Sequence, residues 1–221
     1  MAYAIANFEK YRIKDGKTEI IVSVPGESIG QMIADKEIHC AEMRFDDGRT
    51  ISNEQRRKAY ALIDSIAEWT GYQREEVKDI FKFRYYAETG EESLSLKDCS
   101  VTDARIFITI LMDYCIEEGV QLNEPGVLLA DDIGRYLYMC LMNRKCCVCG
   151  LQGSDIHHVD AIGAGRNRNK IDDSKMRKMC LCRRHHQIVH QLGQPRFDAM
   201  YHVYGIIADK AETTEEDENW G

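Results

Sequence analysis

The sequence lacks the features that would place this protein in a membrane or outside the cell. It has no apolar run of membrane length, no secretory signal peptide and no internal repeat. Nine cysteines in a chain without such a signal predict a reducing, cytoplasmic setting, and we expect no membrane partner. The 221 residues allow two domains, and a hydrophobic fraction of 44% can bury a core in each.

The chain lacks an excess of positive charge over most of its length, and its net charge is −8. Residues 143–205 are the exception, with eleven Lys or Arg against five Asp or Glu. Residues 1–142 have seventeen against twenty-six, and residues 206–221 have one against six. The basic segment therefore predicts a phosphate-binding surface. Its loop at 163–170 carries three candidate DNA contacts, Arg166, Arg168 and Lys170.

Two pairs of metal-binding side chains have the spacing of zinc knuckles. A C-x-x-C pair is followed about thirty residues later by a C-x-x-H pair, and the four candidate ligands are Cys146, Cys149, Cys182 and His185. Zinc binds four such ligands in a tetrahedron, so this pattern predicts a structural zinc site. Cys147 and Cys180 lie beside the knuckles, and the spacing alone leaves the choice of ligands open.

Histidines form a second pattern between the knuckles and just after them. His157 and His158 are adjacent, so on a strand their side chains point to opposite faces, and one can bind a metal while the other meets a water. His186 and His190 are four residues apart, so on a helix they share a face and can hold one ion. The alternative is a second zinc site or a group of surface histidines.

These motifs together resemble those of the ββα-metal HNH endonucleases. The resemblance covers roughly residues 144–195, with CCVCG at 146–150, DIHHV at 155–159 and LCRRHHQIVH at 181–190. It implies that His158 is the general base and that one catalytic divalent ion, Mg²⁺ or Mn²⁺, is held by His157, His186 and His190. It also implies that the two knuckles hold Zn²⁺, and that cleavage of DNA leaves 5′-phosphate and 3′-hydroxyl ends.

The chain departs from that family at one position. The family's middle asparagine, which orients the base, falls on Arg177 here. The candidates to replace it are Ser174, Asn167 and Asn169.

The N-terminal half predicts an α+β domain. Strands are expected at 3–13 and 18–24, joined by a turn at Asp15-Gly16. A short helix near 28–35 and a strand near 37–45 should follow. Helices are then expected from Ser52 to Gly71, over 73–87 with Val77, Ile80 and Phe81 inward, from Thr102 to Gly119, and as one last helix from 123 to 142.

This half resembles, more loosely, the Orf (NinB) recombination mediators of lambdoid phages. The resemblance rests on RTISNEQRRK at 49–58, SVTD at 100–103 and EGV at 118–120. It implies a homodimer that binds single-stranded DNA and single-strand-binding protein in a bacterial host. The implied DNA contacts are Arg49, Arg56, Arg57 and Lys58.

The sequence therefore predicts an Orf-like α+β domain at 1–142, an HNH nuclease domain at 143–205, and an acidic, disordered tail at 206–221. We expect a metal-dependent DNA endonuclease acting in phage recombination. One alternative is a mediator that binds DNA without cutting it and uses the zinc module as a grip. Another is a homing or packaging nuclease with an unrelated N-terminal domain.

Overall fold

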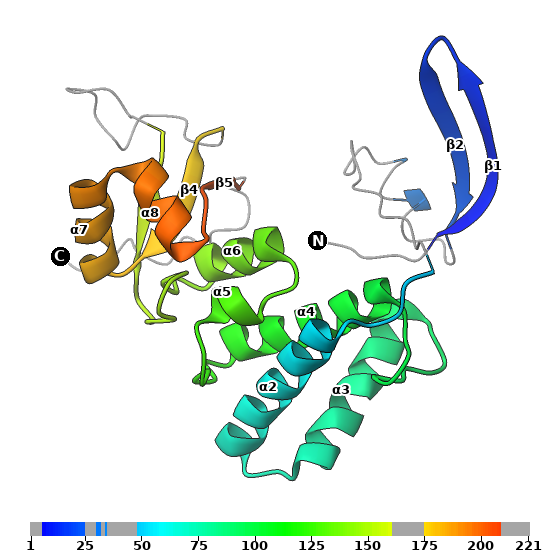
Figure 1. Ribbon diagram of the computed structural model, residues 1–221, viewed down its shortest axis with the longest axis horizontal. Coiled ribbons are helices and arrows are strands. Elements are labelled where there is room, and N and C mark those ends of the chain that lie inside the picture. Colours follow the sequence, from blue (N-terminus) through cyan, green and yellow to red (C-terminus); the bar gives the residue numbers. More distant parts are fainter. Residues whose placement is uncertain (1–5, 25–29, 32–33, 35–47, 161–174, 209–221) are drawn as a thin grey trace.

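The computed structural model describes residues 6–24, 30–31, 34, 48–160 and 175–208, and it has a mixed α+β fold (Figure 1). Two antiparallel strands come first, followed by a group of helices and then by a small sheet flanked by two helices. No helix in the described part of the chain is long and apolar enough to span a membrane.

Strands β1 (Asn7–Lys14) and β2 (Lys17–Ser23) form the predicted hairpin. The turn residues Asp15 and Gly16 both have positive φ, as a two-residue hairpin turn requires. The short helix expected near 28–35 falls mostly outside the described residues, and the strand expected near 37–45 falls wholly outside them.

Three long helices pack together next: α2 (Asn53–Thr70), α3 (Arg74–Thr89) and α4 (Val101–Glu117). Helix α2 begins with the predicted capping box between Ser52 and Gln55 and ends at Gly71 in the left-handed conformation. The predicted inward face of α3 is wrong at one position. Ile80 is 45% exposed, and Tyr85 is fully buried instead.

The single helix predicted for 123–142 is also wrong, because two helices form there. They are α5 (Gly126–Leu129) and α6 (Ile133–Met142), separated by residues 130–132. Asp132 caps α6 by accepting a hydrogen bond from the backbone N–H of Arg135. Asp131 at the break contacts Gln55, Lys58 and Arg105. These contacts with α2 and α4 favour a break over a continuous helix.

The C-terminal part contains an antiparallel sheet in the order β3 (Asp155–His158), β4 (Arg177–Leu181), β5 (Ile206–Ile207). Helix α7 (Arg183–Leu192) follows β4 directly and packs beside α8 (Gln194–Tyr201) (Figure 1). The acidic tail predicted for 206–221 is wrong at its start, because Ile206 and Ile207 belong to the sheet. Residues 209–221 lie outside the described residues.

Both halves share one hydrophobic core. It includes Leu62, Phe107 and Leu137 from the helices and Met179 and Phe197 from the C-terminal part. Helix α6 packs on β4 and β5 as well as on α4, so it links the two parts. The domain boundary at 142/143 stays a prediction.

Candidate metal centres

The first candidate metal centre is formed by the four predicted zinc ligands. Their ligand atoms, from Cys146, Cys149, Cys182 and His185, lie within 4.8 Å of one another. The first knuckle is a turn directly after α6, closed by the hydrogen bond from the Gly150 N–H to the Cys146 carbonyl. The second knuckle begins α7, with Cys182 as its N-cap and His185 in its first turn.

The distances between these atoms fit a tetrahedral zinc ion. Zn–S bonds of about 2.3 Å and Zn–N bonds of about 2.0 Å put neighbouring ligand atoms about 3.5–3.8 Å apart. The Sγ atoms of Cys149 and Cys182 are 3.8 Å apart, and His185 Nδ1 lies 3.4 Å from Cys146 Sγ and 3.2 Å from Cys182 Sγ. Burial raises the pKa of the Cys146 thiol, so a thiolate there needs a bound cation.

The two neighbouring cysteines have other surroundings. Cys180 lies on β4, buried, with its thiol 3.4 Å from the carbonyl of Ser154. The backbone N–H of Cys147 donates to the carbonyl of Cys180, and its side chain is fully buried. Neither residue belongs to the four-atom cluster. Of the ligand sets that the spacing left open, the structure therefore favours the two knuckles.

The second candidate centre consists of three histidines from two elements. His157 on β3 and His186 and His190 on α7 place one ring nitrogen each within 4.8 Å of the others. The ring centroids are 4.9 Å apart for His157 and His186, and 4.7 Å apart for His186 and His190. The spacing i, i+4 puts both α7 side chains on one face, opposite the strand, as the sequence predicts.

His157 is the most enclosed of the three. Its side chain is buried, and burial lowers its pKa, which favours the neutral imidazole that a metal requires. Its Nε2 lies 3.0 Å from Oε1 of Gln194, and the Gln194 amide nitrogen donates to Asp198 at 2.7 Å. With Nε2 protonated and donating to Gln194, Nδ1 has the free lone pair. Sequence reasoning missed Gln194 and Asp198, because no local motif marks them.

His158 occupies the end of β3, half-buried, and the chain that leaves it is held firmly. Two residues on, the Asp160 carboxylate accepts from the backbone N–H of Arg177 at 2.7 Å and from its guanidinium at 2.6 Å and 3.1 Å. The Val159 N–H donates to the Arg177 carbonyl at 2.9 Å. Arg177 stands at the position expected for the orienting asparagine, and its pairing with Asp160 lowers the pKa of that carboxyl.

The proposed replacements for that asparagine, Asn167, Asn169 and Ser174, lie outside the described residues. The same holds for the basic loop residues Arg166, Arg168 and Lys170.

The predicted DNA contacts on α2 are engaged within the protein. The Arg56 guanidinium donates to the carbonyls of Leu96 and Lys97. Arg57 pairs with Glu54 and Glu124. The Lys58 ammonium donates to the Ala130 carbonyl and lies 3.6 Å from Asp131. The Lys58 side chain is thus largely buried, with 15% of its surface exposed. Arg49 is also in contact with neighbours, and its carbonyl accepts from the Val101 N–H.

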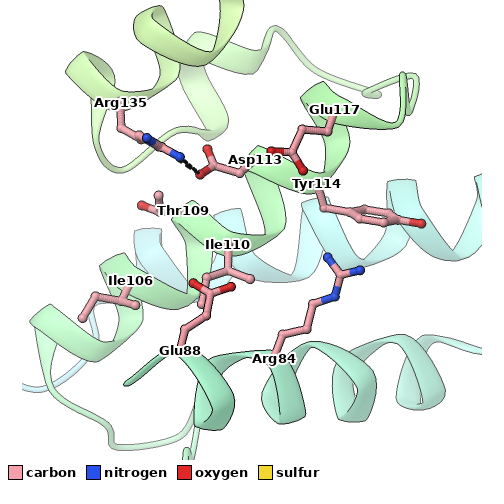
Figure 2. A pocket seen from close by; sticks show the side chains of 9 residues that line it. All are labelled: Arg84, Glu88, Ile106, Thr109, Ile110, Asp113, Tyr114, Glu117 and Arg135. Atoms are coloured by element: carbon pink, nitrogen blue, oxygen red, sulfur yellow. Dashed lines mark hydrogen bonds and ion pairs between the residues drawn. The ribbon is translucent and has the colours of Figure 1, made fainter. Parts of the chain in front are cut away.

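A charged pocket of about 190 Å³ lies elsewhere, between α3, α4 and α6 (Figure 2). Asp113 accepts two hydrogen bonds from Arg135 inside it, and burial raises the pKa of both Asp113 and Glu88. No histidine or cysteine lines this pocket. It is therefore separate from both candidate metal centres.

Strand β3 and helix α7 with its N-cap, which directly follows β4, carry the residues of both clusters, together with the turn after α6. A family model described as "Putative HNHc nuclease" matches residues 24–214, and the chain belongs to this family. No curated protein and no solved structure matches the chain. The match begins at residue 24, far before the metal motifs, so the helical part of the chain is also shared with this family.

Proposed function

We propose that this protein is a metal-dependent DNA endonuclease of the HNH type. The observation that carries the proposal is the histidine cluster of His157, His186 and His190, in which His157 directly precedes His158 on β3. This cluster is separate from the first candidate centre, called here the zinc-like cluster, which consists of Cys146, Cys149, Cys182 and His185. A structural zinc module needs only four ligands. A second set of three imidazoles serves no structural purpose that the zinc-like cluster does not already meet.

The proposed chemistry is hydrolysis of a phosphodiester with His158 as general base. An imidazole, whose ordinary pKa is about 6.5, can accept a proton at neutral pH. A ring nitrogen of His158 takes a proton from water while the water oxygen attacks phosphorus in line. The new P–O bond forms as the P–O3′ bond breaks. The leaving oxygen takes a proton from solvent water and ends as a 3′-hydroxyl, and the other strand end carries the 5′-phosphate.

A divalent ion held by His157, His186 and His190 would stabilise the charge that develops on the phosphate and on the leaving oxygen. The three imidazoles favour a first-row transition metal over Mg²⁺, which prefers oxygen ligands. Of the two catalytic ions expected from the sequence, the donor set thus supports Mn²⁺. Gln194, bonded to Asp198, would hold His157 in the ligating tautomer.

The Asp160–Arg177 pair takes the role of the missing asparagine in this proposal. Three hydrogen bonds hold the chain after His158 to the start of β4. A general base must be held in place to act on one water molecule. The pair would provide that restraint through the backbone, from the first residue of β4.

The biological setting rests on the sequence resemblance. We propose action in phage recombination in the bacterial cytoplasm, with single-strand-binding protein and a second copy of the chain as partners. The runner-up function is a mediator that binds DNA without cutting it. The homing or packaging nuclease also remains an alternative, and single-strand affinity of the N-terminal part distinguishes it. The internal contacts of Arg56, Arg57 and Lys58 weaken the case for α2 as the DNA contact, and the loop at 166–170 stays a candidate.

Plasmid nicking tests the proposal. Wild-type protein should cut supercoiled plasmid with Mn²⁺, and excess chelator should stop cleavage. The variant His190→Ala should retain zinc and lose cleavage, whereas His202→Asn, which alters an exposed histidine outside both clusters, should cut normally. DNA binding without cleavage under any divalent ion would support the mediator instead.

A further inference from the structure

The β1–β2 hairpin has two chemically different faces. Its register pairs Lys10 with Ile21, Arg12 with Glu19, and Lys14 with Lys17. Alternate residues on a strand share a face, so the four cations Lys10, Arg12, Lys14 and Lys17 lie on one side of the ribbon. All four are exposed. The other side carries the pairs Tyr11–Ile20 and Ile13–Thr18.

Two of these lysines are placed where they destabilise the hairpin when nothing is bound to it. Lys14 and Lys17 lie directly opposite each other, and like charges in a cross-strand pair destabilise a sheet. Arg12 has a carboxylate partner in Glu19, but no ion pair within the described residues neutralises either lysine. An anionic partner bound to this face would remove the repulsion.

The ribbon also has little support from the rest of the protein. Among the described elements, β1 and β2 pack extensively only against each other, and Figure 1 shows the hairpin extending away from the helices. An isolated two-stranded hairpin is marginally stable in water. A two-stranded ribbon is narrow enough to enter the DNA major groove, which is about 12 Å wide. Lys10 and Lys14 are four residues apart, about 13 Å along the strand, so the face can reach several phosphates.

We propose that the face formed by Lys10, Arg12, Lys14 and Lys17, called here the basic ribbon, binds the phosphate backbone of duplex DNA. The inference deepens the proposed function, because it rests on DNA being the substrate. The basic ribbon holds the duplex, and the histidine cluster cuts it. The basic ribbon lies within residues 1–142, which have an overall negative charge. Its positive charge is therefore a local patch in an otherwise acidic part of the chain.

Fluorescence anisotropy with a labelled duplex tests the basic ribbon. The full-length His158→Ala protein serves as the background, so cleavage does not interfere. Adding Lys14→Gln and Lys17→Gln should weaken binding about tenfold or more and reduce the slope of log K against log salt by about 1.8. The matched control adds Lys82→Gln and Lys97→Gln, removing the same charge elsewhere, and should change neither quantity.

Two further measurements keep the test decisive. The double variant Lys14→Arg with Lys17→Arg should restore binding, which a folding defect in the glutamine variant would not explain. The melting temperature of the glutamine variant should not fall, because a repulsive pair is removed. Binding equal to that of the control would overturn the basic ribbon without affecting the nuclease proposal, which plasmid cleavage by the wild type tests separately. Loss of a dimer with unchanged DNA affinity would assign the ribbon to a second copy and also overturn the inference.

Discussion

Asp160 and Arg177 form a partly exposed ion pair at the end of the strand that carries His158. The pair joins β4 to the residues that follow His158, and it does so through both a backbone N–H and a guanidinium. The sequence places Arg177 where the family's orienting asparagine is expected, and it suggests Ser174, Asn167 and Asn169 as the replacement. It could not predict Asp160 as the partner, because seventeen residues separate the two and the ladder between β3 and β4 brings them together.

Removing this pair should slow cleavage without weakening substrate binding. We expect Asp160→Asn combined with Arg177→Gln to lower kcat by about tenfold or more, since a small misplacement of a catalytic group is costly. KM should stay within about twofold. The control is Arg74→Gln, which breaks the similarly exposed ion pair with Asp64 between α2 and α3. Steady-state cleavage of an oligonucleotide duplex gives both constants, and an unchanged kcat would show that the pair is only structural.

Helix α6 is the element that connects the helical part to the first zinc knuckle. It ends at Met142, only a few residues before Cys146, as the sequence predicts. The knuckle is further held by Tyr136, whose buried hydroxyl donates to the carbonyl of Cys147 at 2.9 Å. This contact follows from packing of the helix on the turn, and no spacing rule reveals it.

The Tyr136 hydroxyl should therefore contribute to stability. We expect Tyr136→Phe to keep the ring packing but to leave a buried carbonyl without its donor, at a cost of about 1 kcal/mol. For a chain of this size that corresponds to a fall in Tm of roughly 2–4 °C. Tyr72→Phe removes an exposed hydroxyl and is the control. Differential scanning fluorimetry measures both, and equal Tm values would show that the Tyr136 bond contributes nothing.

The sequence predicted local features well and long-range ones poorly. The capping box of α2, the hairpin turn and the spacing within each knuckle or histidine pair involve residues one to four positions apart, which local geometry controls. The break between α5 and α6 and the internal contacts of Arg56 and Lys58 depend on residues distant in the chain. The contact of Gln194 with His157 likewise joins residues that are distant in the chain.

At the scale of the whole molecule, one core runs through both predicted domains. Cys146, Cys147 and Cys182 belong to the same buried cluster as Leu62 and Phe107. Two domains that fold separately would have separate cores. The structure therefore couples the zinc-like cluster to the stability of the helices.

Zinc removal should consequently destabilise the whole protein. We expect about one tightly bound zinc per chain by elemental analysis, and one calorimetric unfolding transition that moves to lower temperature in Cys149→Ser. The free thiol variant Cys99→Ser, outside the cluster, should keep both zinc and Tm. Two transitions, of which only one responds to loss of zinc, would instead support independent domains at 1–142 and 143–205.

The most direct test of the central claim is the cleavage rate of His158→Ala. With Mn²⁺, wild-type protein should convert supercoiled plasmid to nicked and linear DNA with 5′-phosphate and 3′-hydroxyl ends. His158→Ala should be about 10²–10⁴-fold slower, the usual contribution of a general base, while its zinc content and DNA affinity stay unchanged. Cleavage by His158→Ala at the wild-type rate would contradict the account, as would a wild-type protein that cuts DNA with no divalent metal.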